Sequence, residues 1–430
     1  MQFTYNRNNN IDWGSYFLEI FKKLKINFSN KEIILSFQHA LAMFGATILI
    51  PILMGLPPEL GLFSAGIGTL IYHFVTKNMI PVFLGSSAVY LSTFLLIRDN
   101  FDMGTAVGSL LGAGIIYIIV SMIIHKIGHE KIVNIFPNTV AGSVIVVIGI
   151  TLVPVSFMLA ESNYLLALVS AVIMIIYCSI DRGPFRIAPI LLSILTGYIF
   201  SLFTGIVDFK QVLNAPWVSM PPFVAPSFKF APMGIMAIIG VIAMLEHFGD
   251  LTTNGMIVGK NHFESPGLHK SLLGAGLALF IVSLFGGTPT TTYGENNGVL
   301  AITKQYDPKL IRGAAIIAIC LSFFGKFSAF LATIPMPVVG GVSFILFSML
   351  AMSGINAIKN SDVNLMEFRN AALVMIPIFV GAASLLPNNP CQIVIGEYLV
   401  FSGISLAAIV GILLNLFFKL IDKVKDKIKI

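Results

Sequence analysis

Charged side chains are scarce in this sequence. Asp, Glu, Lys and Arg make up 11% of the 430 residues, whereas 56% are hydrophobic, and soluble globular domains carry about 25% charged residues. A water-facing surface for a chain of this length would need far more than 26 basic and 20 acidic residues. The composition therefore excludes a soluble enzyme and indicates a protein whose surface faces lipid.

Cysteines and the common enzyme motifs are equally scarce. The three cysteines, Cys178, Cys320 and Cys391, are far apart and belong to no Cys/His cluster, which argues against a disulfide framework or a structural zinc. The sequence has no HExxH, GxSxG, phosphate-binding loop or GxGxxG followed by an acidic residue. We therefore expect neither an enzyme nor a bound metal or organic cofactor.

Long apolar runs are abundant, and each is long enough to cross a bilayer as a helix of about 20 residues. Their number predicts an all-α polytopic membrane protein with about fourteen spans. Residues 1–32 precede the first span, and their apolar residues recur at helical spacing, which predicts a short helix in the membrane interface or a cap on the bundle. The predicted spans are 33–55, 58–77, 80–97, 104–125, 132–153, 163–180, 187–207, 232–252, 271–286, 288–303, 312–332, 337–357, 370–386 and 392–418.

The distribution of Lys and Arg predicts the orientation of these spans, because short cytoplasmic loops collect positive charge. With the N-terminus inside, the outer loops hold only Arg98, Lys210 and Lys229, and nearly all other Lys and Arg fall on the cytoplasmic side. The basic tail 419–430 then also lies inside, which requires an even number of spans. We expect a multi-pass protein of the cytoplasmic membrane with both termini cytoplasmic, and no binding to nucleic acid.

The two halves of the chain share short motifs in the same order. Gln38-His39 in the first span corresponds to Glu246-His247 in the eighth, and PNTVAGSVIV corresponds to PMPVVGGVSF further along each half. Seven spans per half would place the two copies in opposite orientations. This predicts an inverted repeat of seven plus seven spans, a pattern typical of transporters that alternate between inward-open and outward-open states.

The third and tenth predicted spans are unusual for membrane helices. VFLGSSAVYLS and GGTPTTTYGENNG mix Gly, Ser, Thr and Pro, and the Thr run after Pro289 favours extended backbone. Gly294-Glu295 can then begin a half-helix. Non-helical backbone at membrane depth survives only where protein or a water-filled cavity satisfies it, so the pair predicts a binding site at the middle of the membrane with free amide groups around Ser87 and Gly294.

Three carboxylates, Glu246, Asp250 and Glu295, fall well inside predicted spans. Carboxylates are costly in a membrane and usually functional, although neutralisation by Lys326 would give them a purely structural role. Glu246 and Asp250 are four residues apart and share one helix face. Because two close carboxylates resist being ionised together, we expect Asp250 or Glu246 to take up a proton outside and release it inside, while His39 and His247 pack or form hydrogen bonds.

Two carboxylates beside free backbone amides suit a flat heterocycle with N–H donors and carbonyl acceptors. The N–H groups would meet Glu246 and Glu295, and the oxygens would meet the amides around Ser87 and Gly294. A sugar or an amino acid would use this pattern less well. A ligand that lacked the donors would leave a buried polar group without a partner, which gives specificity.

Five motifs resemble the nucleobase/ascorbate transporter family, and within it the bacterial uracil permeases. They are QHALAMFGATILIP, GSSAVYLSTF, EHFGDLTTNGMIVGK, PGLHKSLLGAGLA and TPTTTYGENNGVLAIT. The resemblance implies proton symport of uracil, short β-strands in the discontinuous segments 3 and 10, and homodimers formed through a gate domain. It also implies a core domain at 33–126 and 232–332 and a gate domain at 132–207 and 337–418.

Carried onto this sequence, the resemblance makes Glu246 and Glu295 the carboxylates that bind the uracil ring and Gly294 a donor of its backbone amide. This sequence departs from the family pattern at two positions. Asp250 stands where the resemblance implies a proton-linked histidine, so a carboxyl pair would carry the proton. Ala88 stands where an aromatic would stack on the base after Gly-Ser-Ser, so Tyr293 or Tyr90 would stack instead, or the pocket would admit a larger base.

Two alternatives follow from these departures. A purine or xanthine permease of the same family is the nearer one, because Ala88 leaves room, although the Tyr-Gly-Glu-Asn run favours pyrimidines. An anion transporter on the same architecture would use the helix N-termini to hold a charged ligand. Two carboxylates beside the site disfavour it.

Overall fold

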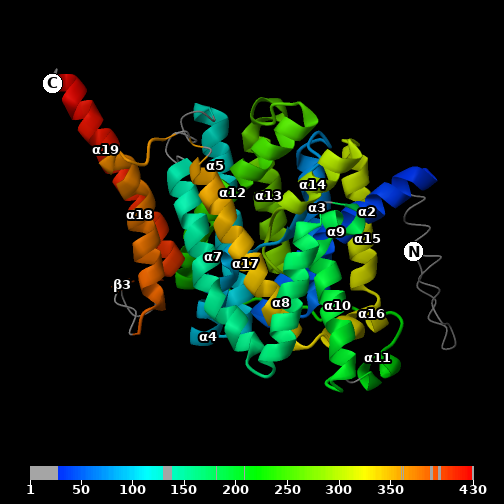
Figure 1. Ribbon diagram of the computed structural model, residues 1–430. Helices are drawn as coiled ribbons and strands as arrows, with labels where there is room; N and C mark the ends of the chain where they lie inside the picture. Colours follow the sequence, from blue (N-terminus) through cyan, green and yellow to red (C-terminus); the bar gives the residue numbers. More distant parts are fainter. Residues whose placement is uncertain are drawn as a thin grey trace.

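The fold is described from a computed structural model. It describes residues 28–128, 138–180, 182–207, 209–359, 361, 363–387, 391–395 and 399–428. Most of these residues are helical, as the sequence predicts, and the helices pack into one bundle with α18 and α19 along one side and α2 and α15 along the other (Figure 1). The predicted interfacial helix within 1–32 lies almost wholly outside the described residues.

Eight helices of the described chain are long and apolar enough to cross a membrane. They are α2 (Asn30–Met54), α5 (Met103–Ile127), α7 (Asn138–Ala160), α12 (Phe230–Val258), α13 (Leu268–Leu284) with the preceding turn η2 (Phe263–Gly267), α17 (Met336–Lys359), α18 (Phe368–Ala382) with the following turn η3 (Ala383–Leu385), and α19 (Gly403–Ile428). The remaining helices are α3 (Pro58–Val75), α4 (Leu91–Asn100), α8 (Tyr164–Ser179), α9 (Gly183–Ile187), α10 (Pro189–Phe203), α11 (Lys210–Asn214), α14 (Gly294–Thr303), α15 (Pro308–Ser322) and α16 (Gly325–Ala332).

Polar caps set where several of these helices begin. Ser29 and Glu32 form a reciprocal capping box at α2, where Ser29 Oγ accepts from the Glu32 amide and the Ser29 amide donates to the Glu32 carboxylate. Asp102 caps α5 by accepting from the Thr105 amide at 2.7 Å. These bonds satisfy N–H groups that the first helical turn leaves without partners. The Thr105 amide also lowers the pKa of Asp102, because its hydrogen bond favours the ionised carboxylate.

Glycines allow the helices to approach closely, because association inside a membrane depends on packing rather than on water exclusion. A Cβ added at Gly354 in α17 would lie 2.5 Å from the Gly142 carbonyl oxygen in α7, and the reverse addition would lie 2.6 Å from the Gly354 oxygen. Gly114 in α5 and Gly276 in α13 meet in the same way. Backbone-to-backbone contact therefore fixes both helix pairs.

Two short strands interrupt the helices in the middle of the bundle. β1 (Leu84–Ser86) pairs with β2 (Thr290–Thr292) in an antiparallel two-stranded sheet, with Gly85 opposite Thr291. A 3-10 turn, η1 (Ala88–Tyr90), leads from β1 into α4, and α14 follows β2 directly. Segments about 200 residues apart in sequence thus meet at one point.

The last part of the chain differs from the single predicted span at 392–418. β3 (Gln392–Ile395) pairs antiparallel with β4 (Leu399–Ser402), and the helix begins only at Gly403. β-Branched and aromatic residues dominate this stretch and favour extended backbone. The segment predicted as a separate basic tail, 419–430, continues α19 as helix as far as Ile428.

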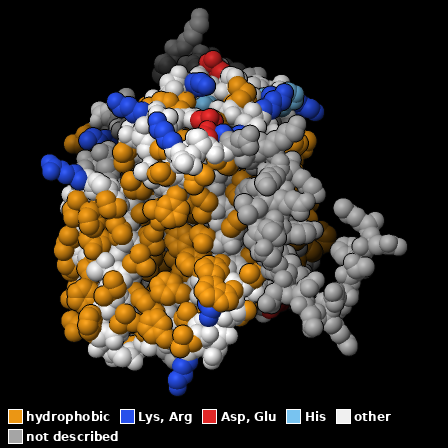
Figure 2. Space-filling view, turned by 90° about the vertical axis from the view of Figure 1, so that its right-hand side faces the viewer, with side chains coloured by type: hydrophobic (Ala, Val, Ile, Leu, Met, Phe, Trp, Pro, Cys, Tyr) orange, Lys and Arg blue, Asp and Glu red, His pale blue; other side chains and the backbone are white. Residues whose placement is uncertain are grey.

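Hydrophobic side chains cover the flank of the bundle. Figure 2 shows them as a broad belt, with Lys and Arg gathered at its upper edge and few charges within it. Such a belt is what lipid requires of a protein surface. Together with the apolar helices it identifies a multi-pass membrane protein.

A substitution at the contact between α7 and α17 tests whether the two helices pack this closely. Replacing Gly354 with Ala should lower the melting temperature of the detergent-solubilised protein, because the added methyl group meets backbone that cannot move aside. Overpacking of this kind costs about 1–3 kcal/mol. The measurement is thermal unfolding followed by size-exclusion chromatography.

Gly234→Ala in α12 is the matched control, because a Cβ there would meet no atom within 4 Å. It should leave the melting temperature unchanged or raise it, since Ala is the better helix former. Equal melting temperatures for the two variants would contradict the close packing of α7 on α17.

Candidate functional site

Side chains of the first helices hold the two strands in place. Thr69 Oγ1 in α3 accepts from the Leu84 amide at 2.9 Å and donates to the Leu84 carbonyl at 3.2 Å. Ser86 Oγ donates to the Thr47 carbonyl of α2 at 3.1 Å, and Ser64 Oγ accepts from the Thr288 amide. Each bond gives a protein partner to backbone that a regular helix would have satisfied internally.

Tyr293 locks the sheet from its other end. Its phenol donates to the Ser86 carbonyl at 2.7 Å, and its amide donates to the Phe83 carbonyl at 3.0 Å. The ring lies so close to Gly85 that a Cβ there would clash with it, so residue 85 can only be glycine. Tyr293 is 5% exposed and Tyr90 is fully buried. Neither ring therefore presents a free face for stacking, contrary to the expectation from sequence.

The three carboxylates converge beside this sheet. Glu246 and Asp250 lie one turn apart on α12, and Glu295 is the second residue of α14. Glu246 interacts electrostatically with both Asp250 and Glu295, and Asp250 Oδ2 accepts a 2.6 Å hydrogen bond from Thr292 Oγ1 at the end of β2. The strand pair thus brings α14 up to the carboxylate face of α12.

Among the described residues, these carboxylates have no positive partner. None of the ion pairs between described residues involves them, and Glu246 Oε2 is buried without a hydrogen-bond partner among those residues. Lys326, the predicted neutralising residue, lies elsewhere: its ammonium donates to the carbonyls of Val212 and Leu213. A buried acceptor without a partner calls for a donor from a ligand or for a proton.

Open space adjoins the carboxylates. A Cβ added at Gly249 in α12 or at Gly298 in α14 would meet no atom within 4 Å, and one at Gly294 would meet only Asp250 Oδ1 at 3.4 Å. All three glycines are exposed, whereas Glu246, Asp250 and Glu295 are half-buried. A small ligand can therefore reach the carboxylates and the N-terminus of α14, where no side chain caps the helix.

Ser87 and Ala88 follow β1 at the edge of the site. Ser87 can offer a ligand its hydroxyl group but not its backbone amide. The Ser87 amide donates to the Pro289 carbonyl at 3.0 Å as part of the strand pairing, so it is not free for a ligand. The Ser87 hydroxyl is buried and has no partner among the described residues. Ala88 is half-buried at the start of η1.

A network of amide side chains, which the sequence analysis missed, ties the site together. Asn254 Nδ2 donates to Asn297 Oδ1 at 2.7 Å and to the Pro81 carbonyl at 3.1 Å. Its Oδ1 lies 3.0 Å from His262 Nε2, and Asn297 Nδ2 donates to the Asp250 carbonyl. The sequence could have indicated Asn254, because it follows Glu246 and Asp250 at four-residue intervals and so lies on the same helix face.

The two candidate histidines lie away from the carboxylate face. His247 Nε2 is 2.8 Å from Ser271 Oγ, which also bonds to the Tyr72 phenol. His39 accepts from Asn296 Nδ2 through its carbonyl oxygen at 3.1 Å, and this ties α2 to α14. In the described part of the chain, no three His, Cys, Asp or Glu side chains are grouped so as to hold a metal ion.

The bundle with a paired strand break at its centre is the fold of known membrane transporters. It matches the transmembrane domain of the cyanobacterial bicarbonate transporter BicA with a TM-score of 0.64 and 16% identity, over 90% of this chain and 98% of that domain. It also matches the murine anion transporter Slc26a9 with a TM-score of 0.64 and 12% identity, over 98% of this chain and 74% of the other. At such low identities only the fold is shared.

Sequence comparison places the chain within this class. Residues 30–386 match the model of a permease family. The uracil permease of Bacillus subtilis is 38% identical over 89% of this chain and 91% of its own length. The uracil permease of Escherichia coli is 36% identical over 91% and 92%, and the putative pyrimidine permease RutG of the same species is 31% identical over 89% and 88%. The chain belongs to this permease family and is a transporter rather than an enzyme.

Asn254 tests how far the site depends on its amide network. Asn254→Ala should lower the melting temperature, because it leaves the Pro81 carbonyl, the Asn297 side-chain oxygen and His262 without their partner. Each buried group without a partner costs about 1–3 kcal/mol.

The neighbouring Asn261→Ala serves as the control, since Asn261 is exposed and bonds to exposed Glu264. We expect its melting temperature to stay within a degree or two of the wild type, as for most surface substitutions. If both variants melt alike, the Asn254 network does not stabilise the site.

Proposed function

We propose that this protein imports uracil across the cytoplasmic membrane together with protons. The observation that carries the proposal is the cluster of Glu246, Asp250 and Glu295, which has no positive partner in the described part of the chain and adjoins open space at the N-terminus of α14. The uracil permeases among its relatives, similar over nearly the whole chain, support the choice of substrate.

Uracil carries the groups that this site lacks. Its two N–H groups are donors that suit Glu246 and Glu295, and Glu246 Oε2 has no donor among the described residues. Its carbonyl oxygens are acceptors that suit the first amides of α14, beginning with Gly294, and the Ser87 hydroxyl. Tyr293 then acts by holding the strands in register rather than by stacking, and Ala88 leaves the face of the base open.

Asp250 is the residue best placed to couple a proton to transport. It lies one helical turn from Glu246 and next to Glu295, and its carboxylate already accepts from Thr292. Three carboxylates this close resist being ionised together. A proton taken up from outside, on Asp250 or Glu246, favours the loaded site, and its release after the site turns inward makes import directional.

Alternating access is the mechanism we propose for this movement. Core segments 33–126 and 232–332 carry the strands and carboxylates, and gate segments 132–207 and 337–418 support them. The order of elements in the first half, two helices, a strand and a short helix, recurs in the second as α12, α13, β2 and α14. This recurrence supports an inverted repeat and about fourteen spans. The prevalence of Lys and Arg in alternate loops supports cytoplasmic termini, and we propose a homodimer formed through the gate.

The carboxylates test the proposed binding mode. Glu246→Gln and Glu295→Gln should each reduce uptake of radiolabelled uracil about 10- to 150-fold, because hydrogen bonds to charged groups contribute about 1.5–3 kcal/mol. The measurement is uptake into cells that lack their own uracil transport. Glu264→Gln, which changes an exposed carboxylate outside the cluster, is the control and should transport normally.

The same assay separates the alternatives. Excess unlabelled xanthine or hypoxanthine should compete poorly with uracil, and a purine that wins at lower concentration would make this a purine permease. An anion transporter would respond in the opposite way, because Glu295→Gln would strengthen the binding of an anion. Normal uracil uptake by both Gln variants would remove the carboxylates from the binding site.

Proton coupling is tested separately at Asp250. Asp250→Asn keeps a side chain of the same shape that can still accept from Thr292, so uracil binding should stay within about threefold of the wild type. Accumulation against a gradient should be lost, because the amide cannot exchange a proton. Binding is measured by isothermal titration and accumulation by uptake with and without a protonophore. Full, protonophore-sensitive accumulation by the variant would exclude Asp250 from the proton path.

A further inference from the structure

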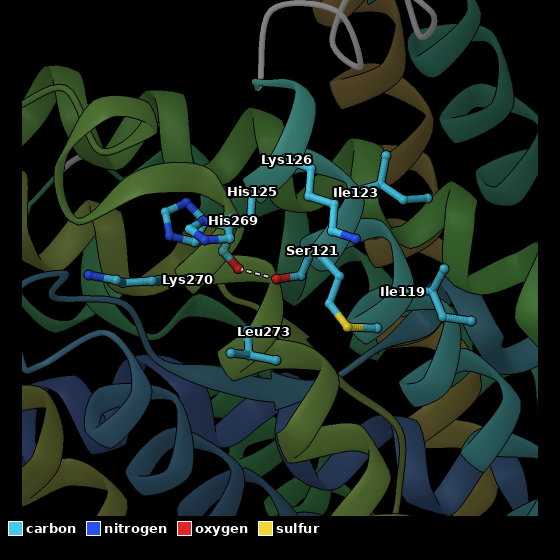
Figure 3. Close-up of a pocket in the computed structure, with 9 residues that line it drawn as sticks. Ile119, Ser121, Ile123, His125, Lys126, His269, Lys270 and Leu273 are labelled. Carbon is cyan, nitrogen blue, oxygen red and sulfur yellow. Dashed lines mark hydrogen bonds between the residues drawn. The ribbon is translucent and has the colours of Figure 1, made fainter.

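A second polar cavity, which shares no lining residue with the carboxylate site, lies where the end of α5 meets the start of α13. A cavity of about 500 Å³ opens there. Figure 3 shows His125 and Lys126 reaching it from α5, and His269 and Lys270 from α13. The two imidazole rings lie side by side with their centroids 4.8 Å apart. The proposed transport path uses none of these residues.

The charge of this cavity is unbalanced. None of the residues that line it is acidic, and neither Lys126 nor Lys270 takes part in the ion pairs between described residues. His269 and Lys270 also lie in the first turn of α13, where the helix dipole adds partial positive charge and no side chain caps the helix. A cation at that end of a helix is unfavourable unless an anion accompanies it. The cavity therefore has the electrostatics of an anion site.

The polar end of the cavity is held rigidly. Ser121 Oγ, which is buried, donates to the His269 carbonyl at 2.6 Å and so ties the first turn of α13 to α5. The His269 ring rests against Gly267, whose φ of +104° and contact with the ring leave no room for a Cβ. The backbone that carries His269 and Lys270 is thus fixed against α5 before any ligand binds, which reduces the entropy lost on binding.

The other end of the cavity is apolar and open toward the hydrophobic belt. Ile119, Met122 and Ile123 line it from α5 and are 40%, 53% and 41% exposed, and Leu273 lies opposite on α13. These residues are one to two turns deeper in α5 than Lys126. A free inorganic anion would use only the basic end, whereas a lipid would use both.

We propose that this cavity binds an anionic phospholipid from the adjacent leaflet, with its phosphate between Lys126 and Lys270 and an acyl chain against Ile119 and Met122. Lys and Arg gather on this edge of the molecule (Figure 2), at the level where headgroups lie, and basic residues at that level attract anionic lipid. Because the cavity is lined by both α5 and α13, a bound lipid would stabilise the packing of these two helices.

The test is native mass spectrometry of the detergent-solubilised full-length protein, titrated with phosphatidylglycerol or with phosphatidylcholine of the same acyl chains. The wild type should bind one phosphatidylglycerol at least tenfold more tightly than phosphatidylcholine. The double variant Lys126→Gln/Lys270→Gln should lose that preference. Lys260→Gln/Lys359→Gln removes two exposed charges that do not line the cavity, so it should bind like the wild type.

Equal binding of the two lipids, or equal loss in the two double variants, would overturn the proposal. Displacement of phosphatidylglycerol by submillimolar inorganic phosphate would overturn the lipid assignment and leave a site for a free anion. A second measurement does not depend on the variants: phosphatidylglycerol with a photoreactive acyl chain should label the wild type within 119–126 or 268–273. Labelling confined to other helices would count against the site.

Discussion

The structure depends on giving every backbone polar group in the membrane interior a partner. Two segments leave the helical conformation there, at β1 and β2, and so lose the bonds that a helix makes within itself. They recover them from each other and from hydroxyl side chains of α2 and α3, of which Thr69 is the clearest example because it serves both the amide and the carbonyl of Leu84. Because these new hydrogen bonds replace the lost ones, the helices can be interrupted without leaving backbone groups unpaired. The interruption in turn leaves the N-terminus of α14 free.

The carboxylates are arranged around that freed helix end. Glu295 belongs to its first turn, Asp250 accepts from the residue that ends β2, and Glu246 lies one turn further along α12. The hydrogen bond from Asn254 to Asn297 holds α12 against α14. Asn254 also bonds to the carbonyl of Pro81, which lies just before β1. The two proposed binding carboxylates of α12 and the supporting Asn254 therefore follow one another along a single stripe of that helix.

Much of this was open to prediction from sequence. Hydrophobic runs locate most of the helices, and the Thr run after Pro289 indicates the break. Three acidic residues inside apolar segments indicate the site, because such residues are rare without a function. The amide of Ser87 itself is not free, since strand pairing uses it. Pairing partners lie about 200 residues apart, and no local pattern specifies which amide is used.

The sequence by itself determined the membrane location of this protein, the position of most of its helices and the identity of the carboxylates within its apolar segments, because hydropathy and charge act locally along the chain. Only the tertiary structure decided which of those groups meet. The burial of the Tyr293 ring on Gly85, the amide network around Asn254 and the four basic side chains shared by α5 and α13 all arise where helices distant in sequence pack together. Their contacts depend on how closely the backbones approach, a distance that sequence patterns do not encode.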